Sequence, residues 1–184
     1  MGVLFVPMFL AGLVMLRKSP ELLRKRLNAR EEQAEQKAVI ALSGLMFLAA
    51  FVLAGLNQRF SWLVLPCWVP WTEAAVFLLA YGLYAEVLRE NAYLSRAIEV
   101  QEGQKVVDTG LYGIVRHPMY AATVLLFLAM PLVLGSLFSF AVMLAYPFLI
   151  AKRIRNEEQV LAAELAGYAD YRQRVKYRLI PGIW

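Results

Sequence analysis

Histidine and cysteine are almost missing from this 184-residue chain, which has one of each, His117 and Cys67. A single cysteine excludes an internal disulfide, and one histidine with one cysteine excludes a zinc or iron–sulfur ligand set built within the chain. We therefore expect no metal site. Charge is scarce too: 18% of the residues are charged and 60% are hydrophobic, against roughly 25% and 45–50% in soluble domains. Both deviations indicate lipid as the solvent.

The net charge of +5 does not predict nucleic acid as a partner, because the basic residues lie between apolar runs. That arrangement is typical of loops on the cytoplasmic side of a membrane protein. The first apolar run starts at Gly2 with no preceding Lys or Arg, and residues 17–18 (Arg-Lys) follow it instead of a small-residue cleavage site. This favours a retained membrane helix over a signal peptide. The length favours a single domain over residues 1–184.

Five apolar runs predict an all-α integral membrane fold with spans at about residues 2–16, 39–56, 70–90, 119–134 and 137–151. A charged amphipathic surface helix is expected within 17–38, beginning at Ser19 and Pro20. Residues 57–59 (Asn-Gln-Arg) are expected to end the second span. The last two spans, joined at residues 135–136 (Gly-Ser), form a hairpin of two short helices that we expect Pro131 and Pro147 to kink.

The distribution of Lys and Arg predicts the orientation. Segment 17–38 holds 7 of them, the 57–61 loop 1, segment 89–118 holds 4 and the tail from residue 152 holds 7. The positive-inside rule then places segments 17–38, 91–118 and 152–184 in the cytosol, with the N-terminus outside. Two of these, 91–118 and 152–184, are therefore expected to face each other at one membrane surface.

Several polar residues at that surface are candidates for chemistry. Pro118 is suited to the first position of the fourth span, whose N-terminus favours an anion. Arg153, Glu157 and Glu164 share a helix face. Arg153 either holds a substrate anion in two-pronged fashion or snorkels to the lipid headgroups. On spacing alone, a Glu-Glu pair such as residues 157–158 is more often a solvated pair, and a lone histidine before proline, such as His117, is more often a structural cap.

The sequence resembles a known family over about residues 80 to 181. Residues 116–120 (Arg-His-Pro-Met-Tyr), a hydrophobic hairpin and residues 157–158 (Glu-Glu) resemble the signature Arg-His-Pro-x-Tyr-x-Gly … Glu-Glu of integral-membrane methyltransferases. These include isoprenylcysteine carboxyl methyltransferases and phospholipid N-methyltransferases. The preceding residues 110–112 (Gly-Leu-Tyr) and the terminal 179–181 (Leu-Ile-Pro) extend the resemblance. The family's glycine two residues after the tyrosine is Ala122 here.

The resemblance implies S-adenosylmethionine as cofactor, bound in a cytosolic pocket that a C-terminal helix closes. Arg153 matches the arginine near the substrate carboxylate, and Glu157 is expected in both a catalytic and a cofactor-binding role. Tail aromatics at Tyr168 and Tyr171 are expected to help close the site. The implied cofactor contacts are Gln104, Lys105, Val106, Val107, Tyr112, His117, Pro118, Met119, Tyr120 and Glu157.

The expected reaction is O-methylation of an isoprenylcysteine-like carboxylate that enters from the bilayer. A carboxylate, with a free pKa of about 3.5, is already deprotonated and needs no general base. N-methylation of a phospholipid ethanolamine headgroup is the alternative, with Glu157 or Glu158 taking the proton. Membrane sterol reductases have a similar C-terminal architecture with a nicotinamide cofactor, although this chain is short for one. A non-catalytic membrane scaffold or transporter remains the fourth hypothesis.

Overall fold

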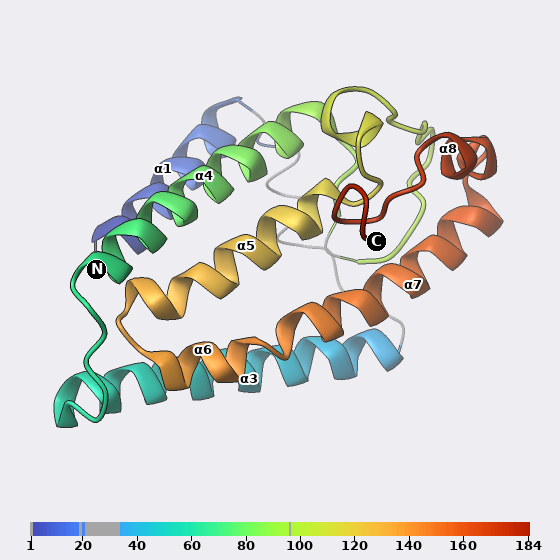
Figure 1. Cartoon of the computed structure of the whole chain (residues 1–184). Helices are drawn as coiled ribbons and strands as arrows, with labels where there is room; N and C mark the ends of the chain where they lie inside the picture. Colours follow the sequence, from blue (N-terminus) through green and yellow to red (C-terminus); the bar gives the residue numbers. More distant parts are fainter. Residues whose placement is uncertain (1, 19, 21–33, 96) are drawn as a thin grey trace.

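A computed structural model describes residues 2–18, 20, 34–95 and 97–184 (Figure 1). Its helices are α1 (Gly2–Lys18), α3 (Ala34–Phe60), α4 (Trp68–Glu90), the 3-10 helix η1 (Gly110–Gly113), α5 (Pro118–Val133), α6 (Leu137–Met143), α7 (Tyr146–Glu164) and α8 (Tyr168–Arg174). These residues contain no strand. The described part of the chain is therefore all-helical, as the sequence predicted.

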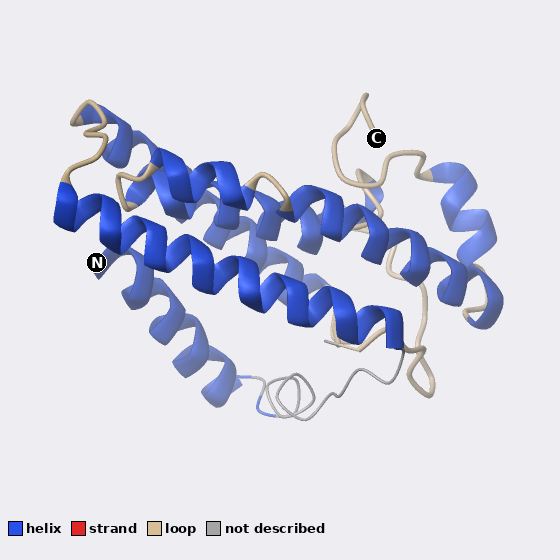
Figure 2. Ribbon diagram, turned by 90° about the horizontal axis from the view of Figure 1, so that it is seen from below, coloured by secondary structure: helices blue, strands red, loops and turns tan. Residues whose placement is uncertain are grey.

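The long helices form a bundle whose two ends differ. Helix α5 packs along α4, α1 flanks α4, and α3 packs against α6 and the first part of α7. The α3–α4 connection and the α5–α6 turn lie at one end of the bundle. The 91–117 loop, α8 and the C-terminus gather at the other end (Figures 1 and 2). The two polar segments that were predicted to face each other do lie together at this second end.

The outward faces of the bundle are apolar. Large hydrophobic side chains stand exposed on the long helices, including Phe9 of α1, Leu45 of α3, Leu79 of α4 and Phe148 of α7. Contiguous apolar surface of this kind marks contact with a membrane or a partner. Among the described residues, three helical stretches are long and apolar enough to cross a membrane: Lys37–Phe60, Trp68–Glu90 and Leu137–Glu164, the last of these taking α6 and α7 together. Two further helices, Leu4–Arg17 and Pro118–Val133, are apolar but shorter.

The second span was predicted to end at residues 57–59, and α3 ends at Phe60, one residue further. Asn57 is buried and does not compete with its own helix for hydrogen bonds. Its Nδ2 donates to the carbonyl of Leu63 at 3.0 Å and to that of Gly135 at 3.1 Å, and its Oδ1 accepts from the Leu63 N–H at 3.1 Å. Asn57 thus joins the α3–α4 loop to the α5–α6 turn.

The fifth apolar run is not one helix over 137–151. Helix α6 ends at Met143, and α7 starts at Tyr146 with Pro147 in its first turn, where a missing N–H costs nothing. Helix α7 then continues past residue 151 to Glu164, sustained by the helix-favouring Lys, Arg, Glu, Gln, Leu and Ala of that stretch. The expected boundary between span and tail therefore falls inside a continuous helix.

The turn of the hairpin and the start of α5 are as predicted, while the kink at Pro131 stays a prediction. Pro118 is the first residue of α5, Gly135 turns the chain at φ +72°, and the Ser136 Oγ caps α6 by accepting from the Ser139 N–H at 3.2 Å. Helix α5 continues through Pro131. Most of the surface helix expected within 17–38 lies outside the described residues, and α3 includes the end of that segment.

Candidate active site

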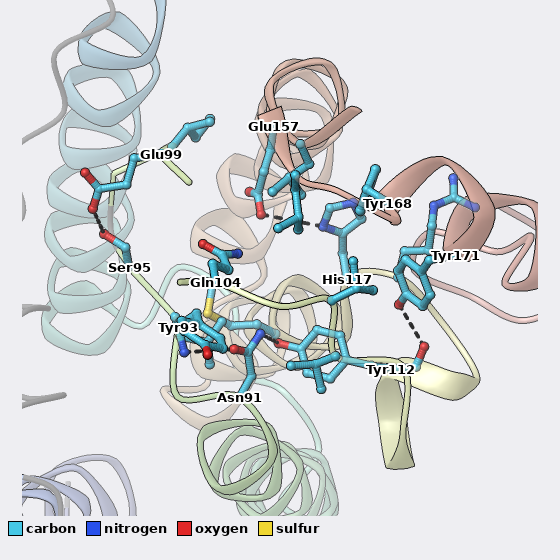
Figure 3. A pocket seen from close by; sticks show the side chains of 18 of the residues that line it. Asn91, Tyr93, Ser95, Glu99, Gln104, Tyr112, His117, Glu157, Tyr168 and Tyr171 are labelled. Carbon is cyan, nitrogen blue, oxygen red and sulfur yellow. Dashed lines mark hydrogen bonds and ion pairs between the residues drawn. The ribbon is translucent and has the colours of Figure 1, made fainter. Parts of the chain in front are cut away.

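A pocket opens at the end of the bundle where the 91–117 loop meets α5, α7 and α8 (Figure 3). The cofactor residues expected from the sequence line this pocket, apart from Pro118: they are Gln104, Lys105, Val106, Val107, Tyr112, His117, Met119, Tyr120 and Glu157. Pro118 is buried at the start of α5.

The C-terminal end of α4 positions Tyr112. The Glu90 carboxylate accepts from the Leu111 N–H at 2.9 Å, and Asn91 Nδ2 donates to the Tyr112 hydroxyl at 3.0 Å. Gly110 has φ +53°, and a Cβ there would lie 1.6 Å from Glu90 Oε1. Burial raises the pKa of the Tyr112 phenol, so its hydroxyl stays neutral. The glycine before Leu111 is thus needed for the turn that presents Tyr112.

Three side chains form a hydrogen-bonded chain across the space between α5 and α7. Arg153 Nε donates to the Tyr120 hydroxyl at 2.9 Å, and that hydroxyl donates to Glu157 Oε2 at 2.6 Å. Arg153 is 9% exposed and is not part of the pocket wall. The snorkelling alternative for Arg153 is therefore wrong, since its side chain is buried against Tyr120. Glu164, on the same predicted face, is exposed.

Glu158 is the centre of a buried ionic cluster. It is 3% exposed, so the solvated-pair alternative is wrong for this residue. Its Oε1 accepts from Arg116 Nε at 2.7 Å and its Oε2 from Arg178 Nε at 2.9 Å, while His117 Nε2 lies 3.4 Å from Oε1. Buried carboxylates persist when charged donors satisfy both oxygens. The cluster ties α7 to the motif before α5 and to the C-terminal segment.

The C-terminal segment, defined as residues 175–184, is also fixed to the motif through backbone groups. The Arg116 N–H donates to the Tyr177 carbonyl and the His117 N–H to the Arg178 carbonyl, both at 2.9 Å. Arg116 Nη1 donates to the carbonyls of Val175 and Lys176 at 2.6 and 2.8 Å. The guanidinium of Arg116 therefore joins Glu158 and the C-terminal segment in one unit.

Helix α8 forms one wall of the pocket with the two tail tyrosines expected there. Tyr171 donates its hydroxyl to the Tyr112 carbonyl at 2.8 Å (Figure 3). Tyr168 is 3% exposed, and its hydroxyl has no hydrogen-bond partner within the described residues. Burial raises the pKa of both phenols. Buried hydroxyls are usually paired in native proteins, which makes the Tyr168 hydroxyl a candidate polar contact for a ligand.

Sequence reasoning missed one wall of the pocket and most of the ionic cluster. The missed wall is the chain after α4, with Asn91, Tyr93, Ser95 and Glu99 among its members. An Asn-x-Tyr directly after an apolar run was the available signal. Arg178 gave no signal because its partner lies 20 residues away, on another element. Ala122 is fully buried in α5 and belongs to the helix packing, not to the pocket wall.

Within the described ranges, no group of three or more His, Cys, Asp or Glu side chains is placed to hold a metal ion. The polar groups of the pocket are carboxylates, amides, hydroxyls, one imidazole and the cationic side chains of Lys105 and Arg116. Such groups suit a polar organic ligand.

Comparisons with known proteins show the family to which the chain belongs. Over 90 residues, or 47% of the chain, it is 31% identical to the Delta(14)-sterol reductase TM7SF2 of Mus musculus. The chain covers only 22% of the length of that curated relative. The model of the isoprenylcysteine carboxyl methyltransferase (ICMT) family matches residues 71–163, which include both the His-Pro motif and the Glu-Glu pair. The chain therefore belongs to the isoprenylcysteine carboxyl methyltransferase family.

Proposed function

We propose that this membrane methyltransferase transfers a methyl group from S-adenosylmethionine to the carboxylate of a lipophilic, isoprenylcysteine-like acceptor. Membership of the family implies a methyltransferase in a membrane. One observation carries the finer proposal: His117 and Tyr120 from one half of the motif and Glu157 from the other line one pocket. The two halves are 37 residues apart in sequence, yet the Tyr120 hydroxyl and Glu157 are hydrogen-bonded.

The chemistry of the pocket fits this cofactor. When bound, S-adenosylmethionine supplies an electrophilic methyl group on a sulfonium. Glu157 offers a carboxylate to its ammonium and hydroxyls, and the N-terminus of α5 favours its carboxylate. Val106, Val107 and the ring of Tyr112 supply the apolar wall that a nucleoside base requires. The unpaired hydroxyl of Tyr168 offers one further polar contact.

Arg153 is proposed to orient the acceptor carboxylate. Its Nε donates to Tyr120, and its guanidinium carries a fixed positive charge whose planar shape suits a carboxylate. Because the acceptor is already an anion, the residues need only align it and exclude water. A cation here attracts an acid and repels an ammonium, which favours the carboxylate acceptor over an ethanolamine headgroup.

The proposal includes five membrane spans, with the N-terminus outside and the pocket facing the cytosol. The two apolar helices that are short for a span, α1 and α5, contact α4, so they are proposed to cross as part of one bundle. Segments 91–118 and 152–184 then form the cytosolic cofactor site of a single domain. The acceptor is proposed to arrive sideways through the bilayer, and the cofactor from the cytosol.

Calorimetry on the purified protein in detergent tests the proposal. We expect saturable binding of S-adenosylmethionine and none of NADPH. No binding at millimolar S-adenosylmethionine would refute the methyltransferase proposal. Selective binding of NADPH would instead favour a reductase, as the name of the sterol reductase relative implies. Radiolabelled cofactor with farnesyl-cysteine analogues or phosphatidylethanolamine then identifies the acceptor. A base-labile product is an ester, and a stable one indicates N-methylation.

A further inference from the structure

His117 lies between the two carboxylates of α7. Its Nε2 is 3.4 Å from Glu158 Oε1, and its Nδ1 is 4.0 Å from Glu157 Oε1. The imidazole is 4% exposed. A neutral imidazole carries one N–H and one lone pair, and the partner of each nitrogen decides which is which. The surroundings of this ring therefore fix its tautomer.

Glu158 acts only as an acceptor towards the ring. Arg116 donates to one of its oxygens and Arg178 to the other, and guanidinium groups cannot accept a hydrogen bond. Two cations at 2.7 and 2.9 Å keep the buried carboxylate ionised. The nitrogen that faces this carboxylate must then carry the hydrogen, because two facing lone pairs repel.

Five charged side chains lie around the ring. Arg116 and Arg178 bind Glu158, Glu157 lies on the Nδ1 side, and Arg153 lies on the far side of Tyr120. The ring of Tyr120 is 5.8 Å from that of His117 between centroids.

We propose that Glu158 is a positioning residue which holds His117 in the Nε2–H tautomer, so that Nδ1 and Glu157 Oε1 form a pair of acceptors for a ligand ammonium. The Oε2 of Glu157 is taken by the Tyr120 hydroxyl, and Oε1 is the oxygen that lies towards the ring. An ammonium placed about 2.9 Å from each acceptor spans their 4.0 Å separation with two of its three hydrogens. A hydroxyl has one hydrogen and serves only one of them.

The ammonium part of this inference rests on the proposed function, because S-adenosylmethionine carries such a group. The tautomer does not rest on it, because Glu158, Arg116 and Arg178 are in place without any ligand. The two proposed roles match the surroundings of Glu158 and Glu157, which differ although the residues are adjacent in sequence. One is buried among cations, and the other is 26% exposed on the pocket side.

The chain has a single histidine, so nitrogen NMR of protein labelled with ¹⁵N-histidine reports on His117 without assignment. Long-range proton–nitrogen correlation in detergent at pH 8 should show a protonated Nε2 and a bare Nδ1. An Nδ1–H tautomer or an imidazolium in the wild-type protein overturns the proposal. This measurement needs no variant and no ligand.

Two variants test whether Glu158 is the cause. In Glu158→Gln, one amide oxygen is contested by two guanidiniums and the amide nitrogen becomes a donor, so both tautomers should be populated to a comparable extent. The matched control Glu157→Gln should keep the Nε2–H form. A folded Glu158→Gln protein with the wild-type tautomer overturns the role of Glu158. If that variant does not fold, Arg178→Met, whose side chain is 26% exposed, should still show the Nε2–H form, because Arg116 holds the carboxylate. Loss of that form in Arg178→Met counts against the mechanism.

Two ligands test the acceptor pair. S-adenosylhomocysteine, which has the ammonium but no transferable methyl group, should shift the Nδ1 resonance. 5′-Methylthioadenosine, which lacks the ammonium, should bind with little shift at Nδ1. Equal shifts refute the ammonium assignment, and binding of both without any shift refutes the acceptor pair. If neither binds, the proposed function and the ammonium site fail together, while the tautomer is still decided by the free protein.

Discussion

Replacing Tyr120 by Phe removes a single oxygen that joins Arg153 to Glu157. That oxygen accepts from Arg153 Nε at 2.9 Å and donates to Glu157 Oε2 at 2.6 Å. A hydrogen bond to a charged group contributes about 1.5–3 kcal/mol. The Glu157 side chain is 26% exposed, so water replaces part of its loss, and we take the lower value. About 1.5 kcal/mol corresponds to roughly tenfold in a dissociation constant.

We therefore expect Tyr120→Phe to weaken S-adenosylmethionine binding about tenfold, because Glu157 is no longer held against the pocket wall. Calorimetry on the detergent-purified protein measures the dissociation constant directly. Tyr177→Phe is the matched control, since Tyr177 is exposed, lies outside the pocket wall and contributes its carbonyl to the C-terminal contacts. Its dissociation constant should equal that of the wild type.

A folded Tyr120→Phe protein with wild-type cofactor affinity would refute this reasoning. It would show that the position of Glu157 does not depend on Tyr120, or that Glu157 does not contact the cofactor. Glu157→Gln separates these two explanations. An unchanged cofactor affinity in Glu157→Gln would show that Glu157 does not contact the cofactor. A weakened affinity would show that Glu157 does contact it and that only the role given to the Tyr120 hydroxyl is wrong.

Three other changes have distinct expected results. Arg153→Met should raise the KM for an acid acceptor about tenfold or more and the cofactor dissociation constant by less; equal effects in steady-state assays would remove Arg153 from the acceptor site. Gly110→Ala places a Cβ 1.6 Å from Glu90 Oε1, so it should lower the melting temperature and weaken cofactor binding through Tyr112, and adding Glu90→Ala should relieve the clash without restoring affinity. Asn57→Ala deletes three hydrogen bonds at the far end of the bundle and should cost about 2–3 kcal/mol of stability in thermal unfolding, with an unchanged cofactor affinity by calorimetry.

The helices could be predicted from the sequence because apolar runs and prolines are local signals. The hairpin turn at residues 135–136, the start of α5 at Pro118 and the extent of α4 follow from a few neighbouring residues. The end of α6 at Met143 did not follow from such signals, because the run 137–151 was predicted as one span. The hydrogen bonds of Asn57 to Leu63 and Gly135 could not be predicted either, because they depend on tertiary packing.

The residues of the pocket were predicted from a motif resemblance, but the interactions among them could not be predicted from the sequence. Nothing in the sequence distinguishes the buried Glu158 from its neighbour Glu157, because burial depends on where Arg116 and Arg178 arrive from other elements. The contact of Arg153 with Tyr120 likewise depends on how α7 meets α5. Which charged groups pair depends on the packed fold. Which residues make up the site can be predicted in part from the sequence.

Helix α7 runs without a break from the apolar Tyr146 to the pocket wall at Leu161. A helix rises 1.5 Å per residue, so Arg153 and Glu157, four residues apart, are separated by about 6 Å along a rigid rod. Arg153, the proposed contact of the acceptor, and Glu157, the proposed contact of the cofactor, therefore keep a constant spacing however deeply α7 lies in the membrane. A change in bilayer thickness moves both together relative to the lipid surface. Lipid chain length should then select which acceptors reach the site and leave the geometry of transfer unaltered.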